Sequence, residues 1–60
     1  MTTRYEVQMF NDMYETWDVI RDGNTDSLID AVNCTTKARK RLGSDIKVRL
    51  VEITERTLDV

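Results

Sequence analysis

Histidine is absent from this 60-residue chain, cysteine occurs once, and no apolar run is long enough to cross a membrane. Histidine is the commonest general base, and the lone Cys34 has no partner base to activate it, so we expect no enzyme. One cysteine cannot form an intrachain disulfide, and there is no clustered set of metal ligands, so we expect no metal and no cofactor. We interpret Cys34 as a small, half-buried residue on the flank of a helix.

The length of the chain indicates one domain, residues 1–60. A domain of this size buries only about 60% of the surface that its unfolded chain exposes, so its stability is marginal and depends on good packing or on association. No segment has the roughly 18 apolar residues of a membrane span, and residues 1–15 show no basic stretch followed by an apolar core. Together with the unpaired cysteine, these features predict a cytoplasmic protein.

The first 21 residues predict a β-hairpin. Residues 3–10 alternate between apolar and polar side chains, which is typical of a half-buried strand. Asn11 and Asp12 supply turn chemistry, and residues 14–21 are rich in aromatic and β-branched residues, which predicts a second strand. The loop lacks the Asn-Gly dipeptide that would define its turn type, so the register of the hairpin stays open. Asp22-Gly23-Asn24 is expected to end the second strand.

A helix is predicted to begin near Ser27, because Ser27 and Asp30 have the spacing of a capping box, with Thr25 as the competing cap. Gly43 is expected to end the helix in a left-handed cap conformation. On a helical wheel one stripe of residues is expected to face the core: Leu28, Ala31, Val32, Thr35, Ala38 and Leu42.

Residues 46–54 are dense in aliphatic residues and predict a third strand, and the tail 55–60 either extends that strand or frays. The predicted fold class is therefore α+β. It is a β-β-α-β domain whose three-stranded antiparallel sheet has the order 2-1-3 and one helix on one face. We expect the helix to cover the sheet face that bears Tyr5, Val7, Met9, Trp17 and Val19, with Trp17 as the main anchor of the core.

The other face of such a sheet is left bare, and apolar residues remain for it. Either Val48 with Leu50 or Val51 with Ile53 belongs there, because the parity of the third strand is not clean. Scattered surface hydrophobes are common, but a contiguous set is typical of a partner-binding or self-association surface. The candidate partner-binding residues of this face are Phe10, Ile20, Val51 and Ile53, beside the acidic Glu6 and Asp18.

The charges are polarised along the chain. Residues 1–36 carry a net charge of −5, residues 37–49 of +5 and residues 50–60 of −2. The basic segment suits the negative end of a helix dipole, which explains much of it without a ligand. A nucleic acid or an acidic protein are the alternative partners of the basic set. Its members are Lys37, Lys40, Arg41, Lys47 and Arg49.

In its general layout the chain resembles the small β-β-α-β accessory proteins of phages and prophages. The resemblance depends on the strand with Tyr5-Glu6-Val7, on Trp17-Asp18-Val19-Ile20, on the capped helix and on the strand with residues 47–51. It implies a small protein that binds and modulates a host or phage macromolecule, and it carries over no site residue. We therefore expect a non-enzymatic interaction protein whose partner is a protein, with a homodimer as one form of that association, and a nucleic-acid-binding module as the alternative.

Overall fold

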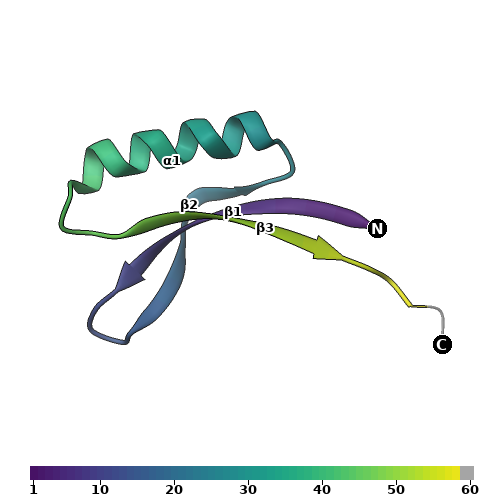
Figure 1. Ribbon diagram of the computed structural model, residues 1–60, viewed down its shortest axis with the longest axis horizontal. Helices are drawn as coiled ribbons and strands as arrows, with labels where there is room; N and C mark the ends of the chain where they lie inside the picture. Colours follow the sequence, from purple (N-terminus) through teal and green to yellow (C-terminus); the bar gives the residue numbers. More distant parts are fainter. Residues whose placement is uncertain (59–60) are drawn as a thin grey trace.

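The computed structural model describes residues 1–58 and contains three strands and one helix in the order β-β-α-β. The elements are β1 (Thr2–Asn11), β2 (Thr16–Thr25), α1 (Leu28–Leu42) and β3 (Val48–Glu55). The strands form one antiparallel sheet in the order β2-β1-β3, and α1 lies across one face of it (Figure 1). The predicted α+β class, the strand order and the single helical layer are thus confirmed.

The central strand β1 pairs regularly with β3. Consecutive pairs run without a break from Thr2↔Glu55 to Met9↔Val48. The ladder continues one residue into the loop, where the Phe10 amide donates to the Lys47 carbonyl at 2.9 Å. Since β3 ends at Glu55, the tail does not extend the strand over residues 56–58, and Asp59 and Val60 lie outside the described residues.

The hairpin between β1 and β2 turns at residues 12–15. The Asn11 side chain organises it, because its Oδ1 accepts from the amides of Met13 at 3.0 Å and Tyr14 at 3.4 Å. This is the local turn chemistry that the sequence indicated. Glu15 takes a φ of 54°, so the second strand begins at Thr16, two residues later than predicted.

The prediction that Asp22-Gly23-Asn24 ends the second strand is wrong. These residues belong to an irregular bulge in β2. Residues 20–23 lie opposite Val7 alone, and pairing resumes at Glu6↔Asn24. Asp22 has a φ of 64°, which turns the chain within the bulge. Gly23 is buried there, and a Cβ on it would lie 2.8 Å from the Ile20 carbonyl oxygen. The strand continues because glycine permits this close approach of two backbones.

Both ends of α1 lie at the predicted residues, but the Ser27 amide does not bond back to the Asp30 carboxylate as it would in a capping box. Ser27 is the N-cap, and its hydroxyl accepts from the Asp30 amide at 3.3 Å. The competing candidate, Thr25, holds the entry to the helix, since its hydroxyl accepts from the Ser27 amide at 3.1 Å. At the other end Gly43 has a φ of 79°, and its amide donates to the Arg39 carbonyl at 3.1 Å.

The core between α1 and the sheet is small. Val7 is fully buried and Ile20 is 8% exposed, and small helix residues pack against them: Ala31, Thr35 and Ala38. The Thr35 hydroxyl donates to the Ala31 carbonyl at 2.8 Å, so this buried polar group has a partner. Around them lie the half-buried residues Met9, Cys34, Leu42, Val48 and Leu50.

The predicted core stripe of the helix is therefore right in part. Leu28 and Val32 were expected to face the core, but they are 52% and 47% exposed. The helix is rotated so that its smallest side chains meet the sheet, which allows a close approach and leaves the larger aliphatics on one flank. Within residues 1–58 no helix is both long enough and apolar enough to span a membrane.

Candidate functional site

The sheet face that α1 leaves uncovered is identified by the strand register. Val7 packs under the helix, so its neighbours Glu6 and Gln8 point to the opposite face. Directly opposed residues share a face, and the pairs are Glu6↔Val51, Gln8↔Arg49, Gln8↔Val19 and Phe10↔Trp17. We call this surface the open face: Arg4, Glu6, Gln8, Phe10, Trp17, Val19, Arg49, Val51, Ile53 and Glu55.

An aromatic and cationic cluster lies at one end of the open face. The rings of Phe10 and Trp17 meet edge to face, with centroids 5.2 Å apart and planes at 65°. The Arg49 guanidinium carbon stacks 4.0 Å from the centroid of the Trp17 ring. These contacts join all three strands, because Phe10, Trp17 and Arg49 come from β1, β2 and β3. Edge-to-face rings and a stacked guanidinium are both attractive arrangements.

A chain of side-chain hydrogen bonds holds Arg49 over the ring. Its Nε donates to Gln8 Oε1 at 2.7 Å, and Gln8 Nε2 donates to Glu6 Oε1 at 3.0 Å. Arg4 continues the chain through ion pairs with Glu6, at 3.4 Å, and with Glu55. Gln8 is nearly buried by these neighbours. The open face is therefore preorganised, because these hydrogen bonds and ion pairs fix its polar side chains, although Arg4 Nε is buried without a partner within residues 1–58.

Four of the six predicted partner-binding residues share the open face: Glu6, Phe10, Val51 and Ile53. Of the two alternatives for the third strand, Val51 with Ile53 is correct, since Val48 and Leu50 pack against the core. Phe10, Val51 and Ile53 are half-buried, and their neighbour Val19 is 47% exposed.

The placement of Ile20 and Asp18 on the open face is wrong. Ile20 packs against Val7 and Ala38 beneath the helix. Asp18 opposes Met9, also on the helix side, and accepts from Asn11 Nδ2 and from Thr16 Oγ1, both at 3.2 Å. The register of the hairpin also places Trp17 and Val19, which were expected under the helix, on the open face. Trp17 is therefore a half-buried residue of the open face and not the anchor of the core under α1.

The predicted basic set does not form one surface. Arg49 lies on the open face over Trp17, whereas Lys37 and Arg41 lie on the helix flank that faces β2. Lys40 is exposed on α1, and Lys47 precedes β3 in the connecting loop. The sheet thus separates Arg49 from the helix cations. The five basic residues are therefore close together in the sequence but do not gather on one surface of the structure.

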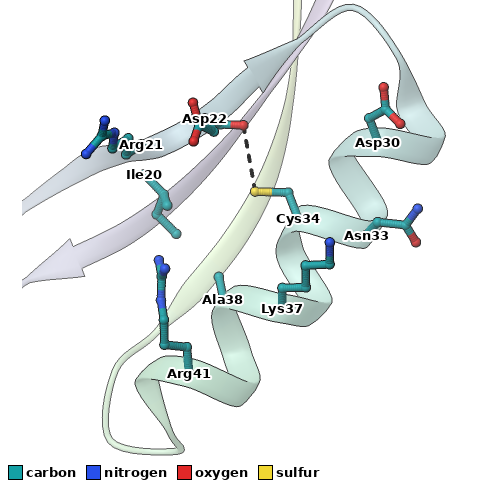
Figure 2. A pocket seen from close by; sticks show the side chains of 9 residues that line it. All are labelled: Ile20, Arg21, Asp22, Asp30, Asn33, Cys34, Lys37, Ala38 and Arg41. Carbon is teal, nitrogen blue, oxygen red and sulfur yellow. Dashed lines mark hydrogen bonds between the residues drawn. The ribbon is translucent and has the colours of Figure 1, made fainter.

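A pocket of about 450 Å³ lies between α1 and β2 (Figure 2), and sequence reasoning missed it. Its apolar floor is formed by Ile20, Cys34 and Ala38, and its rim is polar: Arg21, Asp22, Asp30, Asn33, Lys37 and Arg41. The Cys34 thiol donates to the Asp22 carbonyl at 3.9 Å. The bulge in β2 opens this space, and the only signal of it in the sequence is the Asp22-Gly23-Asn24 run.

The charges around the pocket are mixed. The charged groups of its rim are exposed and of both signs, so they do not create a field of one sign at the thiol. Among residues 1–58 no three acidic, cysteine or histidine side chains gather closely enough to hold a metal ion.

The chain was also compared with known proteins. No protein-family model, no curated protein and no solved structure matches it.

Proposed function

We propose that this protein is a non-enzymatic interaction module that binds another protein through its open face. In this proposal it acts by occupying an apolar surface of its partner, in the cytoplasm, in the manner of the phage accessory proteins that it resembles in layout. Cys34 has a structural role in packing α1 against β2, and no reaction is assigned to it.

The cluster of Phe10, Trp17 and Arg49 carries the proposal. Tryptophan, tyrosine and arginine dominate the binding energy of protein interfaces when they lie at the centre of a patch ringed by other apolar groups. Here the cluster is bordered by Val19, Val51 and Ile53, none of which the helix covers. The largest side chain of the chain is thus held at the surface in a fixed orientation, where it contributes little to the core.

The charges of the open face favour a protein over a nucleic acid. Arg4 and Arg49 are balanced by Glu6 and Glu55 on the same face, and Arg4 is paired with both carboxylates. Nucleic-acid binding requires several unpaired cations on one surface, because the release of counterions from phosphates drives it. The five predicted basic residues are divided between the helix, a loop and the open face, which weakens that alternative.

Affinity capture with two matched variants tests the proposal. Tagged wild-type chain, Trp17→Ala and Tyr14→Ala are incubated with lysate of the cells that express the protein, at low and at high salt. Tyr14 is the control, because it is an equally aromatic but 70% exposed residue of the hairpin turn and is not one of the residues that define the open face. We expect a protein that is retained by the wild type and by Tyr14→Ala and is lost with Trp17→Ala.

The partner should remain bound at high salt, because an apolar interface is less sensitive to screening than an ionic one. Circular dichroism of Trp17→Ala establishes that the variant is folded. Retention of the same partner by folded Trp17→Ala would refute the proposed site. Retention of nucleic acid that falls steeply with salt, and depends on Lys37, Lys40 and Arg41, would support the alternative function instead.

A further inference from the structure

The outer edge of β3 is regular and unpaired within residues 1–58. In an antiparallel ladder, alternate residues direct their backbone groups toward the neighbouring strand. Since the Phe10 amide bonds to the Lys47 carbonyl, the odd residues of β3 face β1. The backbone groups of Val48, Leu50, Glu52 and Thr54 therefore point outward. In agreement, Arg39 of α1 donates to the Val48 carbonyl at 3.4 Å.

The two edges of the sheet differ in how well they could accept another strand. Along β2 the bulge of residues 20–23, with the positive φ of Asp22, interrupts the edge. Bulges of this kind protect natural edges from pairing. The β3 edge pairs with β1 over its whole length without any irregularity. A strand from another chain is thus accommodated at β3 and obstructed at β2.

An apolar strip of the helix borders the β3 edge. The buried line of α1 runs through Ala31 and Ala38, and Arg39 reaches β3 from one flank of that line. Leu28 and Val32 project from this same flank at the 100° spacing of a helix, and each is about half exposed. A strand from another chain that pairs with β3 would therefore cover part of Leu28 and Val32.

The charge pattern of β3 indicates which chain fits. Lys47 directly precedes β3 and Arg49 lies near its start, whereas Glu55 ends it, and all three belong to the open-face side of the strand. Two copies of β3 in antiparallel pairing bring the basic end of each against the acidic end of the other. Such self-complementarity is the property of an interface formed about a two-fold axis.

We infer that this protein forms a homodimer by antiparallel pairing of β3 with β3 of a second copy. A two-fold axis perpendicular to the sheet then places both helices on the same face, with Leu28 and Val32 of each copy between them. The dimer has one continuous sheet and leaves both open faces accessible. This inference does not depend on the proposed function, because it uses a different surface.

Sedimentation equilibrium measures the association, and two variants at Glu52 locate it. Glu52→Pro removes an outward amide that β1 does not use, whereas Glu52→Thr removes the same charge and keeps that amide. We expect the wild type and Glu52→Thr to be dimers, and the dissociation constant of Glu52→Pro to rise about tenfold or more. A wild-type mass that stays monomeric up to about 1 mM chain would overturn the inference.

Val32→Lys tests the helix flank independently and decides the matter if Glu52→Pro does not fold. It places a charge between the two helices at an exposed position that the monomer tolerates, so we expect a dissociation constant about tenfold higher than that of the wild type. Val19→Lys, on the open face but on β2 and so away from the β3 edge, should leave the dimer intact. A dimer that survives Val32→Lys but is lost with Val19→Lys would show that the second copy covers the open face, and would refute pairing through β3.

Discussion

The two faces of the sheet distribute their side chains in opposite ways. The face under α1 is closed by small residues, with Val7 and Ile20 against Ala31 and Ala38. The uncovered face carries the largest rings, Phe10 and Trp17, with Arg49 stacked on them. Short side chains let the helix approach the sheet closely, and the bulky ones then have room only on the other side. In this domain the best-packed residues and the residues proposed to bind a partner are therefore different sets.

The largest expected effect comes from placing the same charge on the two faces. Val7→Asp buries an unpaired carboxylate at a fully buried position, which costs more than about 4 kcal/mol. A single core of this size supplies only about 3–5 kcal/mol, so circular dichroism should find this variant unfolded. Val51→Asp on the open face should remain folded and lose about 1 kcal/mol in urea denaturation. If both variants unfold, the open face belongs to the core and the contrast fails.

The two glycines separate a steric requirement from a conformational one. Gly23→Ala places a methyl group 2.8 Å from the Ile20 carbonyl oxygen and 3.0 Å from the Val7 carbonyl oxygen, between backbones that cannot yield easily. We expect a loss of about 2–3 kcal/mol. Gly43→Ala meets no neighbour but must keep a φ of 79° with a ψ of −175°, a backbone region that is essentially restricted to glycine, which costs about 1–3 kcal/mol. A urea titration in which Gly23→Ala loses less than about 1 kcal/mol would contradict the structure of the bulge.

Trp17→Ala tests whether the largest ring is packed as part of the core or as part of the open face. A tryptophan that anchors a core costs about 3–5 kcal/mol when it is truncated to alanine. Because Trp17 lies half-buried on the open face, outside the core under α1, we expect only about 1–2 kcal/mol from its contacts with Phe10 and Arg49. The midpoint of urea denaturation measures the loss. A cost above 3 kcal/mol would mean that the ring is packed as a core residue.

The smallest effect tests whether the faces are energetically separable. Ser27→Ala removes the N-cap that accepts from the Asp30 amide and should lower stability by about 1 kcal/mol. Since the cap acts only on the covered side, partner binding per folded molecule should not change. Thr36→Ala, on the exposed side of the same helix, is the control and should shift stability by less than about 0.5 kcal/mol. A loss of binding that exceeds the loss of folded protein would show that the faces are coupled.

The elements and their order could be predicted because their signals are local. Alternation in β1, the Ser27 cap and Gly43 each act within a few residues, and each is found as expected. The sheet order followed from the connections between the strands. Val51 with Ile53 could be predicted as one of two possible pairs for the uncovered face, because residues two apart in a strand share a face.

The faces of β2 could not be predicted because the hairpin register was open. Trp17 and Val19 were correctly placed on one side of the strand, but a shift by one residue moves every side chain to the opposite face. The turn at residues 12–15 pairs Phe10 with Trp17 and so puts that side outward. The hydrophobicity of Trp17 predicted the helix side instead, because a large ring is usually a core residue. The bulge at residues 20–23 resembled a strand end, since its turn residues serve both purposes.

Trp17 is the chain's one tryptophan, and its position gives the protein a built-in optical reporter. In most small domains such an indole is buried, so its emission follows unfolding. Here the ring lies on the open face beside a guanidinium, and its emission should change modestly when the domain unfolds. Docking of a partner on that face would remove water from the indole, shift its emission to the blue and shield it from soluble quenchers. Occupancy of the surface can thus be followed without any added label.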